Sequence, residues 1–465
     1  MPVKWCRFHF IYILKYTRYA VILSVIPLLR ALLRFDLASL FAALRQDGLI
    51  FVGTALFALA QWTASGIRVQ NGQLQLRRGA VFRLRVRAGL SSIGAVQLHR
   101  PLYCRMVGAT ELTLWDRYSR RKYRVYLWAG QAAALADQVL PVYPGRAVFS
   151  PAGAERLEFA VLSANLITTG VVSALAAQRT ADLLGEGWKF AFGQLEWVEQ
   201  LVERVLPTGV AWLVTLGLAL ASIAVLRSFL HTAKVQVCRS GGVILSRGGV
   251  VNKTERRVLA AAVTSCEVRV TPLARLLGRS AVYLQAGGFH GDDLPLLVCR
   301  GGDDSALRRL LPEFYLSRSR LVKAPGRSLT QFLWRPGALV LLCGALCGVA
   351  VWALPEMAPL LVLPLVLSLV GLAVSAEAFF TETLARTPGR SLEIRFGRFL
   401  TQHRVCVFSP DAAFVFWQHP MLYSRQICNV TVKLPGGKWY QARGIPAWET
   451  DNLPLLMSLS DDDLP

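Results

Sequence analysis

Two groups of basic side chains have the residue types and spacing best suited to binding chemistry. The first group alternates with apolar residues, and the second surrounds a predicted hairpin turn. They consist of Arg77, Arg78, Arg83, Arg85 and Arg87, and of Arg117, Arg120, Arg121, Lys122 and Arg124. Such cations attract anionic lipid headgroups, at about 1 kcal/mol per charge near a bilayer surface. They could instead be solvated surface that only sets membrane topology, and both interpretations stay open.

Patterns typical of enzymes and metal sites do not occur in the sequence. The six histidines form no H-E-x-x-H pair, and there is no phosphate-binding loop, nucleophile elbow or dinucleotide fingerprint. Nine cysteines include no C-x-x-C pair. The acidic pairs 292–293 and 303–304 fit turns, and the second is placed to cap a helix. We expect no enzyme activity, cofactor or metal; a catalytic site assembled between repeats is a remaining alternative.

The composition indicates a membrane protein. Of the 465 residues, 54% are hydrophobic and 17% are charged, which is too apolar for a purely soluble chain. Uncharged runs long enough for a hydrocarbon core of about 30 Å occupy residues 48–67, 159–178, 206–226, 336–355 and 357–376, with a shorter sixth run at 19–29. They group into three hairpins. We expect Arg30 and Glu377, near the run ends, to reach the interface.

Charge asymmetry predicts the topology. Segment 67–150 has 14 basic and 3 acidic residues, segment 231–325 has 15 and 7, and segment 178–205 has 3 and 5. Basic flanks remain in the cytoplasm. We therefore expect both termini and the segments between hairpins to be cytoplasmic. Residues 180–205 would then lie outside, where their tryptophans and phenylalanines predict an amphipathic interfacial helix. This segment could instead cap the bundle of spans.

A long repeat organises the chain. Gly79, Gly249 and Gly397 recur at spacings of 170 and 148 residues, and each follows an apolar hairpin. Around them, alternating apolar and polar residues predict short strands, such as 67–70 and 73–77 joined by a turn at Asn71-Gly72. Six or seven short strands and a closing helix per copy imply a small barrel or a pair of packed sheets.

One motif within the repeat resembles a known family. A proline, an arginine and a glycine in close spacing follow the central strand of the first two copies, and the proline alone remains in the third. These residues are Pro101, Arg105 and Gly108, then Pro272, Arg275 and Gly278, and finally Pro420. The arrangement after a membrane hairpin is similar to that of multi-pass bacterial PH-domain membrane proteins of the bPH2 type. The resemblance implies PH-like barrels capped by a helix and brings no settled activity.

The predicted fold class is an α+β membrane protein. Six transmembrane helices in three hairpins would alternate with three small PH-like β-barrel modules, each capped by a helix. The predicted segments are 1–66 (N-terminal segment and hairpin), 67–150 (module), 151–230 (hairpin), 231–325 (module), 326–380 (hairpin) and 381–465 (degenerate module).

The predicted function is a non-enzymatic platform of the bacterial inner membrane that binds lipid or protein. The lipid contacts expected are Arg77, Arg78, Arg83, Arg85, Arg87, Arg120, Arg121 and Lys122. Protein partners would be a second copy or another PH-like membrane protein. Nucleic acid is not expected, because the charge lies beside apolar runs and lacks interleaved aromatics. The alternative is a transporter or export accessory subunit whose helices carry the function.

Overall fold

The fold is described by a computed structural model of the chain. The residues it describes are 5–14, 17, 52–80, 83–143, 147–163, 200, 222–223, 225–286, 296–300, 307, 312, 321–353, 358–387, 391–398, 400–409, 411–435 and 438–450. They belong to two compact units. Unit 1 comprises Met1–Arg146, Cys238–Arg247 and Val251–Ala262; unit 2 comprises Ala147–Val237, Gly248–Val250 and Val263–Pro465.

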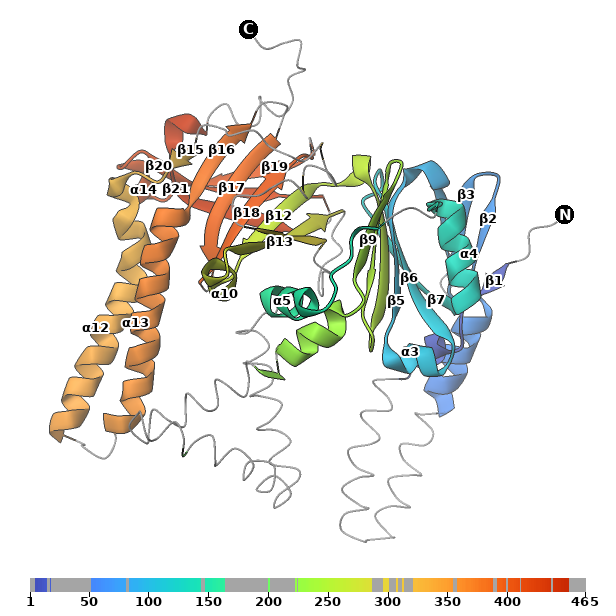
Figure 1. Cartoon of the computed structure of the whole chain (residues 1–465), viewed down its shortest axis with the longest axis horizontal. Helices are drawn as coiled ribbons and strands as arrows, with labels where there is room; N and C mark the ends of the chain where they lie inside the picture. Colours follow the sequence, from blue (N-terminus) through green and yellow to red (C-terminus); the bar gives the residue numbers. More distant parts are fainter. Residues whose placement is uncertain are drawn as a thin grey trace, which may run out of the picture. The chain divides into compact units, whose positions relative to one another are not determined.

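Unit 1 contains two antiparallel sheets and several helices (Figure 1). The first, sheet A, has the order β1 (Cys6–Arg7), β2 (Gly66–Gln70), β3 (Gln73–Arg78), β4 (Leu84–Gly89). The second, sheet B, runs within this unit in the order β7 (Lys122–Trp128), β6 (Ala109–Asp116), β5 (Ile93–Arg100), β11 (Lys253–Leu259), β10 (Val243–Gly248), β9 (Gln236–Ser240). The helices of this unit include α4 (Ala129–Val139) and the helical residues 52–63.

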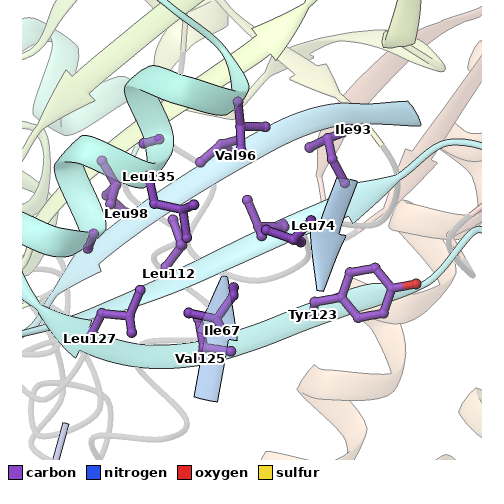
Figure 2. Packing of buried hydrophobic residues seen from close by; sticks show 14 of the residues in the cluster. Ile67, Leu74, Ile93, Val96, Leu98, Leu112, Tyr123, Val125, Leu127 and Leu135 are labelled. Atoms are coloured by element: carbon purple, nitrogen blue, oxygen red, sulfur yellow. The ribbon is translucent and has the colours of Figure 1, made fainter. Parts of the chain in front are cut away.

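The period-2 pattern of the strands builds the core of unit 1. Ile67 and Leu74 of sheet A, Leu112 of sheet B and Leu135 of α4 are all buried in one cluster (Figure 2). Asn71 and Gly72 have φ of 51° and 68°, as a two-residue hairpin turn with the twist of its strands requires. The turn fixes the register of β2 and β3, and with it the side of sheet A on which each arginine lies.

Unit 2 also contains two antiparallel sheets. Sheet C has the order β14 (Leu297–Arg300), β13 (Arg279–Gln285), β12 (Ser265–Val270), β18 (Thr401–Val407), β17 (Ser391–Arg398), β16 (Thr383–Thr387), β15 (Leu321–Lys323). Sheet D has the order β19 (Ala413–Trp417), β20 (Ile427–Lys433), β21 (Trp439–Pro446). The further elements named below are α5 (Ala154–Ser163), α10 (Pro272–Leu276), α12 (Leu329–Ala353), α13 (Ala358–Thr381) and α14 (Pro420–Tyr423).

Neighbouring repeats share sheets. In unit 1, β5 of the first repeat pairs with β11 of the second. In unit 2, β12 of the second repeat pairs with β18 of the third. The strands of the second repeat are therefore divided between two sheets, and each junction is a continuous backbone ladder rather than a contact between closed modules.

Two long apolar helices stand out in unit 2. Gly326–Ala353 and Pro364–Thr381 have mean hydropathies of 2.0 and 1.7, with only 6% and 11% of their apolar windows buried. In the core of a soluble protein, such helices would be covered by other residues. Here α12 and α13 run side by side (Figure 1). Their apolar windows are largely uncovered. This exposure fits association with a membrane.

The predicted fold class is wrong. The structure has open sheets where β-barrels were predicted. Strands β5 and β12, which would close their own modules, pair instead with strands of the next repeat. The predicted six-helix bundle is not found either, because within the described ranges two helices meet the length and hydropathy of a span. The run at 48–67, for example, is helical over 52–63, and Ile67 already lies in β2.

Several predicted features fall outside the described residues. They are the run at 19–29 with Arg30, most of the runs at 159–178 and 206–226, nearly all of segment 180–205, and the acidic pairs 292–293 and 303–304.

Candidate functional site: a basic sheet face

The outward side of sheet A is strongly basic. Its inward side chains, including Leu74 and Leu76, are buried, so the alternating residues of the same strands face away from the core. We call the outward arginines the basic face. They are Arg7, Arg68, Arg77, Arg85 and Arg87.

The strand register brings these arginines together. Arg77 lies opposite Arg85, and on its other side it lies opposite Gly66, which in turn faces Arg7 of β1. Arg87 lies opposite Gln75. Residues 66–89 contain six arginines and no acidic residue, so no carboxylate of these strands offsets the charge.

The arginines of the first predicted cluster do not all belong to the basic face. Arg77, Arg85 and Arg87 project from the face, and Arg85 and Arg87 are exposed. Arg78, by contrast, donates from Nη2 to the carbonyl oxygen of Arg124 and so ties sheet A to β7. Arg83 is exposed just before β4 begins.

Acidic partners lie elsewhere in unit 1. Arg124 Nε pairs with Glu111 Oε1 at 2.7 Å, and Arg257 Nη1 pairs with Asp137 Oδ1 at 2.6 Å. Among the described residues, the structure gives no ion pair to Arg77, Arg85 or Arg87. Their positive charge is therefore available to an external anion.

Arg7 and Arg68 were not among the predicted contacts. Arg68 Nε donates to Gln75 Oε1 at 2.8 Å, and its guanidinium lies 4.5 Å from the ring centre of Trp5. The Asn71-Gly72 turn gave enough information to place Arg68 beside Gln75. Nothing in the sequence indicated that Cys6 and Arg7 would add β1 to the edge of this sheet.

The second predicted cluster lies at the β6–β7 turn. Arg120, Arg121 and Lys122 are exposed there. Asp116 Oδ1 accepts from the backbone N–H groups of Tyr118 and Ser119, at 3.0 and 3.3 Å, and shapes the turn. These three cations sit on a different element from the basic face, so the two clusters remain separate candidates.

The family-motif residues occupy one recurring turn with a structural role. Pro101 precedes helix α3 (Leu102–Met106), whereas Pro272 and Pro420 begin α10 and α14. The residue that ends the turn has a left-handed backbone conformation, with φ of 71° at Gly108 and 60° at Gly278. Arg105 Nη1 lies 3.4 Å from the carbonyl oxygen of Val251, and Arg275 Nη2 lies 2.6 Å from Glu377 Oε1.

Glu377 therefore has a partner that the sequence did not suggest. We expected its carboxylate to reach the membrane interface, and the structure joins it to Arg275 of α10 and, at 3.4 Å, to Gln402 Nε2. The ion pair connects the end of α13 to the motif turn of the second repeat.

Unit 2 contains a buried carboxylate that sequence reasoning missed. Glu267 on β12 is 2% exposed; its Oε1 lies 2.8 Å from His403 Nδ1 and 2.7 Å from Arg269 Nε, and its Oε2 lies 2.8 Å from Lys438 Nζ. Burial opposes ionisation, but the His403 hydrogen bond and the two cations outweigh it and hold the pKa of Glu267 well below its usual value. This cluster stabilises the β12–β18 junction, with Lys438 reaching it from near β21.

No metal-binding group of three or more His, Cys, Asp or Glu side chains occurs in the part of the chain that the structure describes. The absence of cofactor and enzyme activity stays a prediction.

Comparison with known proteins supports a PH-like first module. Residues 11–141 match the family model described as Bacterial PH domain, a segment that includes β2 to β7 and α4. No curated protein and no solved structure matches the chain. The resemblance found in the sequence is thus confirmed in part: residues 11–141 are similar to a bacterial PH domain, and the multi-pass membrane architecture stays a prediction.

Proposed function

We propose that the chain is a non-enzymatic membrane-anchored platform whose basic face binds anionic lipid headgroups. The observation that carries this proposal is the set of arginines on the outward side of sheet A, brought into register without an acidic residue in the same strands. A PH-like domain is a binding or assembly module, which agrees with a binding role.

Three further observations support attachment to a bilayer. Helices α12 and α13 are long, apolar and largely uncovered. Helical residues 52–63 lead directly into sheet A, and Leu56 is 62% exposed on that helix. The β3–β4 turn is attached to the same helix, because Ala80 N donates to Gln61 Oε1 at 3.2 Å. If this helix meets the bilayer, Arg77 and Arg85 lie at the end of the sheet nearest to it.

The wider proposal places the protein in the bacterial inner membrane with the sheets on the cytoplasmic side, as the charge asymmetry predicts. The basic face would then meet the anionic cytoplasmic leaflet. A transporter role has no specific observation in its favour.

The test uses the full chain in detergent, titrated with short-chain phosphatidylglycerol and, separately, phosphatidylcholine. Replacing Arg77, Arg85 and Arg87 together by alanine removes about 3 kcal/mol of attraction, a loss of roughly 100-fold in affinity for the anionic lipid. The matched lysine triple variant keeps the charge and should retain most of that affinity.

A second variant set separates the two clusters. Alanine at Arg120, Arg121 and Lys122 should leave the affinity within a few fold of the parent. Equal binding of both lipids by the parent, or a loss seen only in this second set, would show that the basic face is not the lipid site.

A further inference from the structure

Each sheet ends in two edge strands among the strands that the structure describes, and the repeat relates two of these edges, β4 and β19. Sheet A ends at β4, and sheet D ends at β19. Both edge strands are exposed: Leu84 of β4 is 55% exposed, and Phe416 and Trp417 of β19 are 41% and 53% exposed. An open strand edge presents unpaired N–H and C=O groups to another chain.

The repeat shows what these edges can accept. Strands β4, β11 and β18 end the first half of successive repeats, and β5, β12 and β19 begin the second half. Within the chain, β11 pairs with β5 and β18 pairs with β12. Two strands take no part in these junctions: β4, the equivalent of β11 and β18, and β19, the equivalent of β5 and β12. They are therefore of the two kinds that pair with each other at the internal junctions.

Both existing junctions have the same register. Val96 of β5 lies opposite Arg257, and Cys266 of β12 lies opposite Cys406. Val96 and Cys266 are equivalent, because they face Leu114 and Leu284 in the next strand. Arg257 and Cys406 are equivalent as well, because each corresponds to Arg87 of the first repeat. Arg257 follows Arg87 by the 170-residue offset of the repeat. Cys406 matches Arg87 through the pairing between strands in the first half of the repeat.

That pairing is seen in the neighbouring strands. Leu74 and Leu392 occupy equivalent positions, and they lie opposite Ala88 and Val407. The residues that precede Ala88 and Val407 are Arg87 and Cys406. On β19, the equivalent of Val96 is Phe414, because it faces Val432 as Val96 faces Leu114. The shared register thus places Phe414 opposite Arg87 and Phe416 opposite Arg85.

Backbone polarity agrees with this register. Leu90 N donates to Gly72 O at 2.9 Å, so alternation turns the N–H groups of Arg85 and Arg87 away from β3, toward the open edge. At the β12–β18 junction, Phe408 N donates to Thr264 O at 3.0 Å. The same alternation makes Cys266 and Cys406 a hydrogen-bonded pair, and its equivalent is Phe414 with Arg87.

We propose that β19 of one copy pairs antiparallel with β4 of a second copy and continues the internal junction between molecules. Phe414 and Phe416 would then lie opposite Arg87 and Arg85, a favourable aromatic–guanidinium arrangement, and Trp417 would lie opposite Leu84. Since β19 carries no charge, no like charges meet. A head-to-tail contact of this kind leaves an edge open at each end and can extend to further copies.

Proline at the open edges tests the proposal. Arg85→Pro and Phe416→Pro each remove an N–H that points toward the open edge, which a folded edge strand tolerates. The full chain in detergent should form dimers and larger species by mass photometry, and each proline variant alone should be monomeric. A mixture of the two should form dimers only, because one variant retains β19 and the other retains β4.

The alanine variants Arg85→Ala and Phe416→Ala are matched controls that keep the N–H and should still assemble. Arg87→Pro serves as a second β4 variant should Arg85→Pro lower the thermal midpoint. A parent chain that stays monomeric at every concentration, proline variants that assemble like the parent, or a mixture without dimers would overturn the pairing. Lipid affinity is a separate readout, since Arg85→Ala should weaken it whereas assembly, carried by the backbone pairing, should persist.

Discussion

Arg77 of β3 lies directly opposite Arg85 of β4, a like-charge pair on the solvent side of sheet A. Like charges placed directly across two strands destabilise a sheet by about 0.2–1 kcal/mol. A face that keeps such a pair gives up stability that a single substitution would recover. This cost is the expected signature of a surface that serves binding rather than folding.

Arg85→Glu should therefore move stability and binding in opposite directions. The new carboxylate opposite Arg77 raises the free energy of unfolding by up to about 1 kcal/mol. Reversing the charge weakens phosphatidylglycerol binding by about 2 kcal/mol, or roughly 30-fold. Thermal unfolding and lipid titration of the same preparation measure both. A parallel loss of stability and affinity would instead assign Arg85 a structural role.

Glu267→Gln should remove part of the acid sensitivity of unit 2. Because the folded pKa of Glu267 lies well below its unfolded value of about 4.3, its stabilisation is complete above that value. It is lost as the pH falls through the folded pKa. Urea midpoints between pH 3 and pH 7 should therefore fall less steeply in the variant, which also starts from lower stability at pH 7.

The matched control for this prediction is Glu255→Gln. Glu255 pairs with Arg257 in unit 1, and its side chain is 29% exposed against 2% for Glu267. The slope of stability against pH should change more in Glu267→Gln than in this control. Identical slopes for all three proteins would mean that Glu267 is not the acid-sensitive group.

Arg257→Met should loosen the contact between β11 and the C-terminal end of α4. Arg257 Nη1 donates to the carbonyl oxygen of Leu140 at 3.0 Å, at the C-terminal end of α4, and its side chain is 8% exposed. Loss of this charge-assisted hydrogen bond should cost about 2 kcal/mol, seen as faster hydrogen exchange in α4. Asp137→Asn, which alters only the 63%-exposed partner, should cost less than about 1 kcal/mol.

Gln426→Gly should stabilise unit 2. Gln426 has φ of 53° at the position held by Gly108 and Gly278 in the other repeats, and a side chain in this conformation costs about 1 kcal/mol. The denaturant midpoint should rise, whereas Gly278→Gln should lower it by a similar amount. A decrease for both variants would show that the Gln426 side chain contributes more than its backbone costs.

Local features of the fold could be predicted from the sequence. The Asn71-Gly72 turn and the alternation of 73–77 follow from φ preference and strand period, and they locate the basic side chains correctly on sheet A. The motif was recognised fully in the first two repeats and by its proline alone in the third, where Pro420 begins α14 at the same turn. In the third repeat, Gln426 ends the turn with the same left-handed φ, although the other two repeats have glycine at this position.

Long-range pairing could not be predicted in this way. The repeat suggested three closed modules, because strand periodicity specifies which side of a strand is buried and not which strand is its neighbour. The choice between β4 and β11 as the neighbour of β5 depends on contacts between residues more than 150 positions apart. Glu267 was missed for the same reason, since its partners His403 and Lys438 belong to the third repeat.

The central claim is that the basic face contacts anionic lipid, and photo-cross-linking locates that contact directly. The full chain would be reconstituted in nanodiscs with phosphatidylglycerol carrying a photoreactive headgroup, and labelled peptides would be identified by mass spectrometry. We predict that the most strongly labelled peptide outside the apolar helices covers residues 73–89, and that this label falls in the alanine triple variant of Arg77, Arg85 and Arg87 and at high salt. Label that is confined to residues 117–124, or that is unchanged in the triple variant, would contradict the account.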